Sequence, residues 1–512
     1  MKKLLAFSAT FFVYISTFCQ GYTTATFTSV DRLQKIEKTF PVVDALFKAQ
    51  AEKAHYPGLV WGLVVDGKLV HIGSTGYANV QKKIAAGSNS VFRIASMTKS
   101  FTAMAILKLR DEGKLNLDDP ASKYIPEMKN LRYATTDARP ITIRDLLTHR
   151  AGFPEDNPWG DRQLADSDEE LLSMMKNGVS FSNVPGIAYE YSNFGFALLG
   201  TVVSNVSKQP YDQYITQNIL KPLGMNHTYW EYTKVPDLQL ARGYRWINST
   251  WRDEALLGHG SFGAMGGLMT TIEDFAKYVA FHLSAWPPNN SPDNGPIKRS
   301  SLREMHQPWN FGSLNANFKY PGGRACAMAS AYGYGLRWER DCQDRTYVGH
   351  SGGLPGFGSQ WRILPEFGIG IISFANLTYA GTGNVNLQVL DTIIALAELK
   401  ARVVPPSAIL NQRKSELVKL LSEWKNAEKS GIFAENFFAD YIIDSLRKEA
   451  SNIFKRIGSI KSIGEMTAVN QLRGSFVLMG ENAEAEVWFT LTPENPPLIQ
   501  EYRIRFLPKK TN

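Results

Sequence analysis

Ser96 and Lys99 form a Ser-x-x-Lys pattern within the stretch that runs from Phe92 to Phe101. On a helix, residues three positions apart share one face, so these two side chains can meet without help from distant parts of the chain. A serine hydroxyl is a weak nucleophile at neutral pH and needs an adjacent base. A lysine can be that base when burial and neighbouring charge lower its pKa. The pattern therefore indicates an activated serine nucleophile.

The spacing alone does not single out this serine, because the chain contains other Ser-x-x-Lys matches. They are Ser173/Lys176, Ser422/Lys425 and Ser445/Lys448. What distinguishes Ser96 is the apolar pattern that follows it, which predicts a buried helix ending near Gly113. Burial of that helix would place Lys99 at the edge of a core and remove part of its hydration.

Tyr191-Ser192-Asn193 is a second candidate motif, which we expect on a loop that leads into a helix over residues 196–204. A tyrosine hydroxyl beside a lysine can relay a proton, and an asparagine amide can orient a substrate carbonyl. Taken alone, a tyrosine packed at a loop–helix junction is the simpler interpretation. His149, at the end of a short helix expected within residues 141–153, is interpreted as a residue that holds a loop.

His350-Ser351-Gly352 is a third motif, and it lies in a region where the pattern changes from helices to strands. Asp66-Gly67 is a hairpin turn signal between two further strands near the N-terminus. Strands are predicted over 59–65, 68–72, 333–339, 345–348, 360–364 and 368–376, and helices over 31–54 and 387–399.

The composition is that of an ordinary globular protein, and the formal net charge of +8 is mild. The sequence has no run of five or more basic residues, so nucleic acid is not indicated as a partner. We expect a small-molecule or peptide substrate, and a basic surface also suits association with the cell envelope. The oligomeric state is left open.

The N-terminus has the pattern of a secretory signal peptide. Lys2 and Lys3 precede an uncharged, mostly apolar run over residues 4–18, which is too short for a membrane span. We therefore predict a signal peptide over 1–21 and an exported protein, periplasmic or in the cell envelope. A lipid anchor on Cys19 is the alternative.

Two domains are predicted beyond that segment. The first would span residues 22–402, and the composition of residues 402–407 indicates a linker. Residues 408–512 carry two amphipathic helices followed by strands, a pattern that predicts a small α+β domain. Cys326 and Cys342 either form one disulfide or remain two buried thiols. Neither has the Cys/His spacing of a zinc site.

With the three motifs in this order, the chain resembles the serine β-lactamase and penicillin-binding protein superfamily. The similar branch contains class C β-lactamases, D,D-carboxypeptidases, D-aminopeptidases and related serine esterases, and the resemblance covers roughly residues 40–400. It implies a mixed α/β fold, in which an antiparallel sheet flanked by helices lies beside a helical lobe, with the active site between them. The C-terminal segment is similar to NTF2-like or cystatin-like small domains.

The resemblance also implies roles for the motif residues. Ser96 would attack a carbonyl and form an acyl-enzyme, while Lys99 and Tyr191 would manage the proton. The amide of Asn193 would hold the substrate. The backbone N–H groups of Ser96 and Gly353 would form the oxyanion hole, and His350 and Gly352 would line the substrate. No metal and no cofactor are implied.

The departure from the family pattern is at His350, where most β-lactamases and transpeptidases have a lysine. A histidine is largely neutral above about pH 6.5, which weakens the case for a β-lactam or a free C-terminal carboxylate as the main substrate. We therefore predict a serine hydrolase of small peptide-like amides, such as D-amino acid peptides and cell-wall fragments, or of esters. The alternatives are a carboxylesterase or weak β-lactamase of the same fold, and a non-catalytic penicillin-binding or sensor protein.

Overall fold

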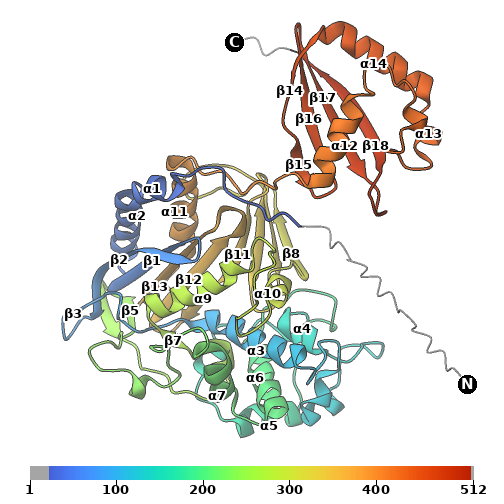
Figure 1. Cartoon of the computed structure of the whole chain (residues 1–512). Helices are drawn as coiled ribbons and strands as arrows, with labels where there is room; N and C mark the ends of the chain where they lie inside the picture. Colours follow the sequence, from blue (N-terminus) through green and yellow to red (C-terminus); the bar gives the residue numbers. More distant parts are fainter. Residues whose placement is uncertain (1–21, 509–512) are drawn as a thin grey trace, which may run out of the picture. The chain divides into compact units, whose positions relative to one another are not determined.

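The computed structural model describes residues 22–508 of the chain, and these form two units (Figure 1). The larger unit spans residues 29–401 and the smaller one spans residues 402–508. Residues 22–28 belong to the smaller unit, because Thr26 forms two backbone hydrogen bonds with Val403. The sequence pattern placed this segment with the first domain instead. The predicted signal peptide lies outside the described residues.

A nine-stranded antiparallel sheet forms the centre of the larger unit, in the order β3-β2-β1-β13-β12-β11-β10-β9-β8. The N-terminal hairpin lies beside β13, with Leu59 opposite Ala375, so segments from both ends of this unit complete one sheet. This confirms the antiparallel sheet that the family resemblance implied. The strands are β1 (Gly58–Val65), β2 (Lys68–Asn79), β3 (Ile84–Ala85), β8 (Asn310–Asn315), β9 (Met328–Tyr332), β10 (Arg337–Asp341), β11 (Thr346–Leu354), β12 (Phe357–Leu364) and β13 (Ile369–Ala375).

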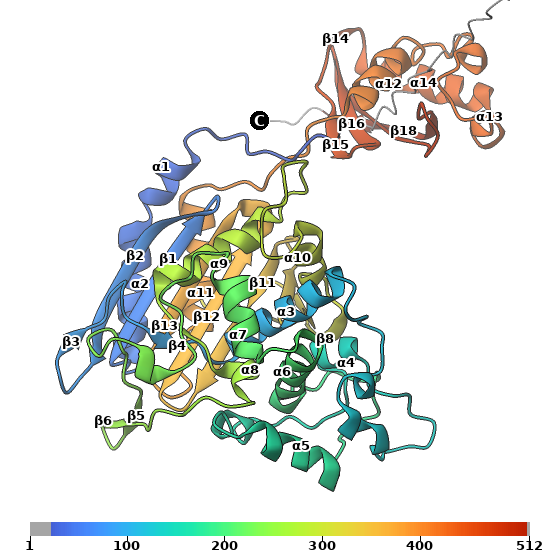
Figure 2. The same ribbon diagram turned by 60° about the horizontal axis from the view of Figure 1, so that its bottom comes forward.

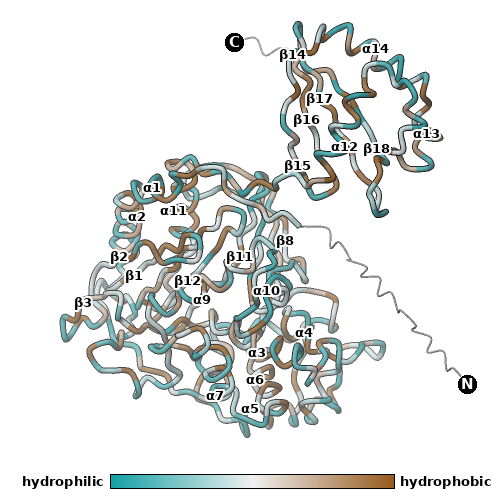
Figure 3. Tube along the Cα trace, viewed as in Figure 1, coloured by the Kyte–Doolittle hydropathy of each residue, from teal (hydrophilic) through white to brown (hydrophobic). Residues whose placement is uncertain are grey.

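Helices cover both faces of this sheet (Figures 1 and 2). On β1, Leu59 and Trp61 face a core shared with one helical layer, while Val60 and Val64 face the core on the other side. Because both faces of β1 are buried, its sequence is a continuous apolar run and does not alternate between apolar and polar residues. Figure 3 shows hydrophobic colouring along the central strands. The first layer is α1 (Arg32–Glu37), α2 (Phe40–Lys53) and α11 (Gly383–Leu396), and the opposite face holds α9 (Ile272–Ser284).

A mostly helical lobe is inserted between β3 and β8 in the sequence. Its central helices α3 and α6 pack against each other and are buried over most of their length. Besides α9, which covers the sheet, the α-helices of this inserted region are α3 (Lys99–Asp111), α4 (Ile143–Leu147), α5 (Asp168–Asn177), α6 (Asn193–Ser207), α7 (Tyr211–Ile215), α8 (Gly263–Gly266) and α10 (Arg299–Met305). Two short strand pairs accompany them, β4 (Phe92–Arg93) with β7 (Met269–Thr270) and β5 (Tyr244–Ile247) with β6 (Thr250–Asp253).

Two elements that carry motifs differ from their predicted bounds. Helix α6 begins at Asn193 rather than at Phe196, because the Ser192 hydroxyl accepts the N–H of Gly195 and Asp156 accepts the N–H groups of Asn193 and Phe194. Strand β11 extends to Leu354, so the His350 motif lies within a strand and not after one.

The smaller unit combines helices with a five-stranded antiparallel sheet, whose path is β14-β16-β17-β18 with β15 also paired to β16. On α14, the buried residues Leu446, Ala450, Ile453 and Ile457 form one stripe at helical spacing. The unit is thus a small α+β domain. Its elements are α12 (Ala408–Val418), α13 (Phe437–Asp440), α14 (Ile443–Ile457), β14 (Ile460–Ile463), β15 (Thr467–Asn470), β16 (Arg473–Gly480), β17 (Glu484–Leu491) and β18 (Ile499–Leu507).

Cys326 and Cys342 form a disulfide, which was one of the two alternatives left open by the sequence. It joins the segment before β9 to the turn after β10. Within residues 22–508, no helix combines the length and the apolar character needed to cross a bilayer.

Candidate active site

Ser96 lies in a short 3-10 helix (Ala95–Thr98, η1) that leads directly into α3. Ala95 adopts a φ of +49°, in the left-handed region that non-glycine residues rarely occupy. The turn is held from two sides, because the Ser359 hydroxyl of β12 donates to the carbonyl of Ile94 at 2.8 Å and the N–H of Ile94 donates to Leu268 at 3.0 Å. The backbone around the candidate nucleophile is therefore fixed by the sheet and by the lobe together.

Lys99 is completely buried and its Nζ donates to three oxygens. They are Oγ of Ser96 at 3.1 Å, Oδ1 of Asn193 at 2.7 Å and the carbonyl of Met265 at 3.1 Å. Burial lowers the pKa of Lys99 to about 7, against the opposing charges of Asp161 and Asp156. A large fraction of the lysine is thus neutral near pH 7 and able to accept a proton.

Tyr191 completes the group around Ser96. Its ring centroid lies 4.9 Å from the Lys99 Nζ. Burial raises the pKa of Tyr191 far above its usual value, although a hydrogen bond with Ser96 acts in the opposite direction. The phenol therefore keeps its proton. His149 supports the loop from behind, because its ring lies 4.3 Å from that of Tyr191 and its Nδ1 accepts the N–H of Ser192 at 3.1 Å.

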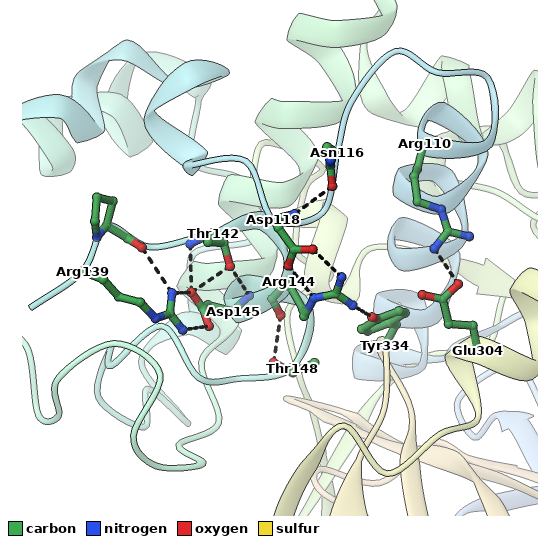
Figure 4. Close-up of polar contacts among 11 residues, drawn as sticks. Arg110, Asn116, Asp118, Arg139, Thr142, Arg144, Asp145, Thr148, Glu304 and Tyr334 are labelled. Atoms are coloured by element: carbon green, nitrogen blue, oxygen red, sulfur yellow. Dashed lines mark hydrogen bonds and ion pairs between the residues drawn. The ribbon is translucent and has the colours of Figure 1, made fainter.

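Helix α4, which precedes His149, is anchored by a polar network (Figure 4). Arg144 donates to Asp118 at 2.7 and 2.8 Å and to the hydroxyl of Tyr334, which lies between β9 and β10. Asp145 receives a forked hydrogen bond from Arg139 and closes a capping box. These contacts connect the helix that leads to His149 to the strands beside β11.

The amide of Asn193 is buried and both of its ends are engaged. Its Oδ1 accepts from Lys99, and its Nδ2 donates to Oδ1 of Asn157 at 2.6 Å. The amide thereby orients the lysine. The family resemblance implies that Asn193 holds the substrate. To do so, its amide would have to replace one of these two hydrogen bonds with a hydrogen bond to the substrate.

His350 is a neutral residue in this environment. Its Nδ1 lies 2.5 Å from the carbonyl of Ser351, which can only accept, so Nδ1 carries the proton and Nε2 accepts from the Tyr332 hydroxyl at 2.8 Å. Burial lowers the pKa of His350 well below its usual value, and the charges of Arg337 and Lys99 act in the same direction. His350 thus offers no positive charge to a substrate.

Gly352 and Gly353 allow β11 to approach the nucleophile. A Cβ at Gly352 would lie 2.2 Å from the carbonyl oxygen of Ile94, next to the Ser96 turn. A Cβ at Gly353 would lie 2.8 Å from the ring of Tyr379. Side chains at these positions would push the strand away from Ser96, so the approach depends on glycine.

Arg337 is a site residue that the sequence analysis missed. It lies on β10, opposite Gly349 of β11, and its guanidinium is 5.9 Å from the ring of Tyr191. The side chain is exposed and forms no ion pair with a carboxylate of the described residues. Arg337 belongs to no sequence motif. Only the register between β10 and β11 brings this residue to the site. Arg337 is thus a cation near Tyr191, on the strand next to the one that carries His350.

An apolar pocket of about 460 Å³ lies in the lobe beside the first turn of α6, and neither Ser96 nor Lys99 is among the residues that line it. Phe153, Trp159 and Phe194 supply much of its wall, and Asp156 and Ser192 connect it to the start of α6. Among the described residues, by contrast, the other Ser-x-x-Lys pairs are exposed at all of their positions: Ser173, Lys176, Ser422, Lys425, Ser445 and Lys448.

Comparisons with known proteins agree with this architecture. The family model described as Beta-lactamase matches residues 43–392, a range that contains every site residue named above. "Protein flp" of Staphylococcus aureus strain MW2 is 31% identical over 380 residues, covering 73% of this chain and 70% of that protein. The strain COL protein is 33% identical over 341 residues, covering 65% and 62%.

Two further similarities have lower coverage or lower sequence identity. "Beta-lactamase-like protein 2" of Dictyostelium discoideum is 31% identical over 261 residues, covering 49% of this chain and 47% of that protein. Among solved structures, the octameric penicillin-binding protein homologue from Pyrococcus abyssi aligns with a TM-score of 0.57 and 22% identity, covering 91% of this chain and 99% of that one. This likeness concerns the fold alone.

Proposed function

The chain belongs to the beta-lactamase family, and from this premise we propose that it is a serine hydrolase that forms an acyl-enzyme on Ser96. The observation that carries the proposal is the 3.1 Å contact between the Ser96 hydroxyl and a completely buried lysine amine. A neutral amine at this distance can take the hydroxyl proton as the oxygen attacks.

Lys99 is the base in this proposal. Burial lowers the pKa of Lys99 to about 7 but raises that of Tyr191, so near neutral pH the lysine accepts a proton more readily than the tyrosine. Ser96 Oγ bonds to the carbonyl carbon, its proton passes to Lys99, and the oxyanion is held by the N–H groups of Ser96 and Gly353. One such donor stabilises the transition state by about 3 kcal/mol.

Tyr191 is the acid in the same step. It gives its phenolic proton to the leaving group as the bond from the carbonyl carbon breaks, and the proton on Lys99 replaces it. Water then attacks the acyl-enzyme, Lys99 accepts a proton from the water, and Ser96 regains a proton as the acid is released. Protons and bonds balance over the cycle.

The proposed substrate is a small peptide-like amide or ester with a free carboxylate on the leaving group. The neutral His350 gives a substrate carboxylate no positive charge to bind. Arg337, however, supplies an exposed cation on the neighbouring strand. A guanidinium can donate two parallel hydrogen bonds to a carboxylate. The apolar pocket beside Asp156 suits a side chain on the acyl part.

The disulfide supports the further proposal that the protein acts in an oxidising compartment outside the cytoplasm.

Hydrolysis of N-acetyl-D-alanyl-thioglycolate, followed through the released thiol, tests this function. We expect turnover by the wild type, none by Ser96→Ala, and full turnover by Ser173→Ala, which removes the serine of an exposed Ser-x-x-Lys pair. Arg337→Ala should raise KM for this substrate but not KM for the corresponding methyl ester. Equal turnover by the wild type and Ser96→Ala would overturn the proposal.

A further inference from the structure

Asp161 is a buried carboxylate to which the catalytic steps above assign no role. It lies in a short 3-10 helix of the lobe (Gly160–Arg162), with 1% of its surface exposed. Its Oδ2 accepts from the hydroxyl of Tyr379 at 3.1 Å, while its Oδ1, also buried, accepts no hydrogen bond from the described part of the chain. An ionised carboxylate can accept about four hydrogen bonds, so this one is far from satisfied.

The segment that carries Asp161 lies beside two residues of the candidate site. Gly160, the preceding residue, lies against Asn193, since a Cβ there would be 2.9 Å from the Asn193 Cβ. The partner Tyr379 packs against Gly353, whose N–H belongs to the proposed oxyanion hole. Asp161 therefore lies next to the groups that would surround the reacting carbonyl.

Asp161 and Arg337 lie toward opposite ends of the β11 segment that flanks Ser96. Arg337 pairs with Gly349 at one end of this segment. At the other end, the backbone N–H of Tyr379 donates to the carbonyl of Leu354 at 3.3 Å, and the hydroxyl of the same residue reaches Asp161. A substrate aligned along β11 would thus meet a cation at one end and an anion at the other.

Within residues 22–508, no cation of the protein bonds to the open oxygen of Asp161. Burial raises the pKa of this carboxyl to about 6, while the charge of Lys99 acts to lower it. Lys99 acts only through space, because its Nζ bonds to Ser96, Asn193 and Met265. The other main influences on the pKa of Asp161 are Tyr379, Asp156 and Glu155, and none of these three is a cation. An ammonium group of a ligand would offset the cost of burying this charge.

We propose that Asp161 forms an ammonium-binding subsite on the acyl side of Ser96, which takes the free α-amino group of a short peptide. The direction of the substrate rests on the proposed function, in which Arg337 holds the carboxylate of the leaving group. Together the two charges select a zwitterionic dipeptide, with the amine on the acyl residue and the carboxylate on the released one.

Calorimetric titration of the full-length Ser96→Ala protein tests the subsite without any turnover. The probes are D-alanyl-D-alanine and N-acetyl-D-alanyl-D-alanine, which differ only in the ammonium group. We expect the free dipeptide to bind at least about tenfold more tightly, as a hydrogen bond to a charged group allows. Adding Asp161→Asn should remove this difference, whereas adding Asp137→Asn, an exposed carboxylate of the same lobe, should preserve it.

Equal affinity for the two dipeptides, or binding of neither, would overturn the ammonium subsite. A parallel assay of D-alanine release by proteins with Ser96 intact separates the two proposals. If the wild type hydrolyses neither dipeptide but the Asp161-dependent preference in binding is present, the hydrolase proposal fails and the subsite stands. If both are hydrolysed and Asp161→Asn changes both rates equally, the carboxylate acts only on Lys99 and the subsite fails.

Discussion

At the scale of single residues, the proposed chemistry depends on the charge of Lys99. Complete burial favours its neutral form, and the charge of Arg337 adds to this effect, whereas Asp161 and Asp156 favour the ammonium. The balance places the pKa at about 7. The amine is therefore a usable base at neutral pH while it still accepts and returns protons.

The first prediction is that acylation accelerates with rising pH and levels off above a midpoint at about 7, because the neutral amine is the active form. The rate of labelling of Ser96 by a fluorophosphonate, followed over about pH 5–9, measures this. Arg337→Ala should shift the midpoint upward, since the nearby cation disfavours the ammonium. Asp161→Asn should shift it downward, since the nearby carboxylate favours the ammonium. A labelling rate that falls with pH would contradict the role of Lys99.

The second prediction concerns Tyr191 as the acid. Tyr191→Phe keeps the ring but removes the proton donor, so a poor amine leaving group should suffer more than a good thiolate. We expect kcat/KM for an amide to fall by about 10²–10⁴-fold and that for the matched thioester to fall much less. Equal losses on both substrates would show that the hydroxyl serves another step.

At the scale of elements, the site is made by the close approach of β11 to the turn that carries Ser96. Gly352 permits this approach, because any Cβ would meet the carbonyl of Ile94 at 2.2 Å. The turn is bound in addition to β12 through Ser359. Strand, turn and helix α3 must therefore be assembled together before the serine is correctly placed.

The third prediction is that Gly352→Ala lowers kcat/KM at least about tenfold and destabilises the fold by about 1–3 kcal/mol, as overpacking does. Thermal unfolding and thioester turnover measure the two effects. Gly381→Ala is the matched control, since a Cβ at that exposed loop position meets nothing within 4 Å. An unchanged rate for Gly352→Ala would mean that β11 does not need this approach.

Sequence patterns predicted some of these elements correctly and missed others. The pattern after Ser96 predicted a buried helix, and α3 is buried from Lys99 to Leu107. The loop expected around Asn193 is instead the first turn of α6, because the capping carboxylate of Asp156 comes from a distant loop that no local pattern reveals. Arg337 was missed for a similar reason, since only strand register brings it to the site.

At the scale of the whole molecule, the site and the smaller unit are separate in the sequence. Every residue assigned to the site lies within residues 29–401, and the family match ends at residue 392. The small α+β domain was predictable from the order of its helices and strands after the linker, and the mixed α/β fold from the family resemblance. The assignment of residues 22–28 to the smaller unit could not be predicted in this way. It depends on an isolated bridge between Thr26 and Val403 and not on any periodic pattern.

The fourth prediction is that a chain shortened to residues 29–401 folds and keeps acylation at Ser96, because its sheet and both of its cores are complete within this range. Circular dichroism and the rate of fluorophosphonate labelling measure the two properties. A folded fragment that has lost labelling would show that the smaller unit contributes to the chemistry.

The formation of a covalent acyl-enzyme on Ser96 is the central claim, and intact-mass spectrometry after exposure to penicillin or a fluorophosphonate tests it most directly. We predict one added mass on the wild type and on Ser173→Ala, mapped by peptide digestion to Ser96, and no added mass on Ser96→Ala. Labelling of Ser96→Ala to the same extent as the wild type, or an adduct that maps to another residue, would contradict the account.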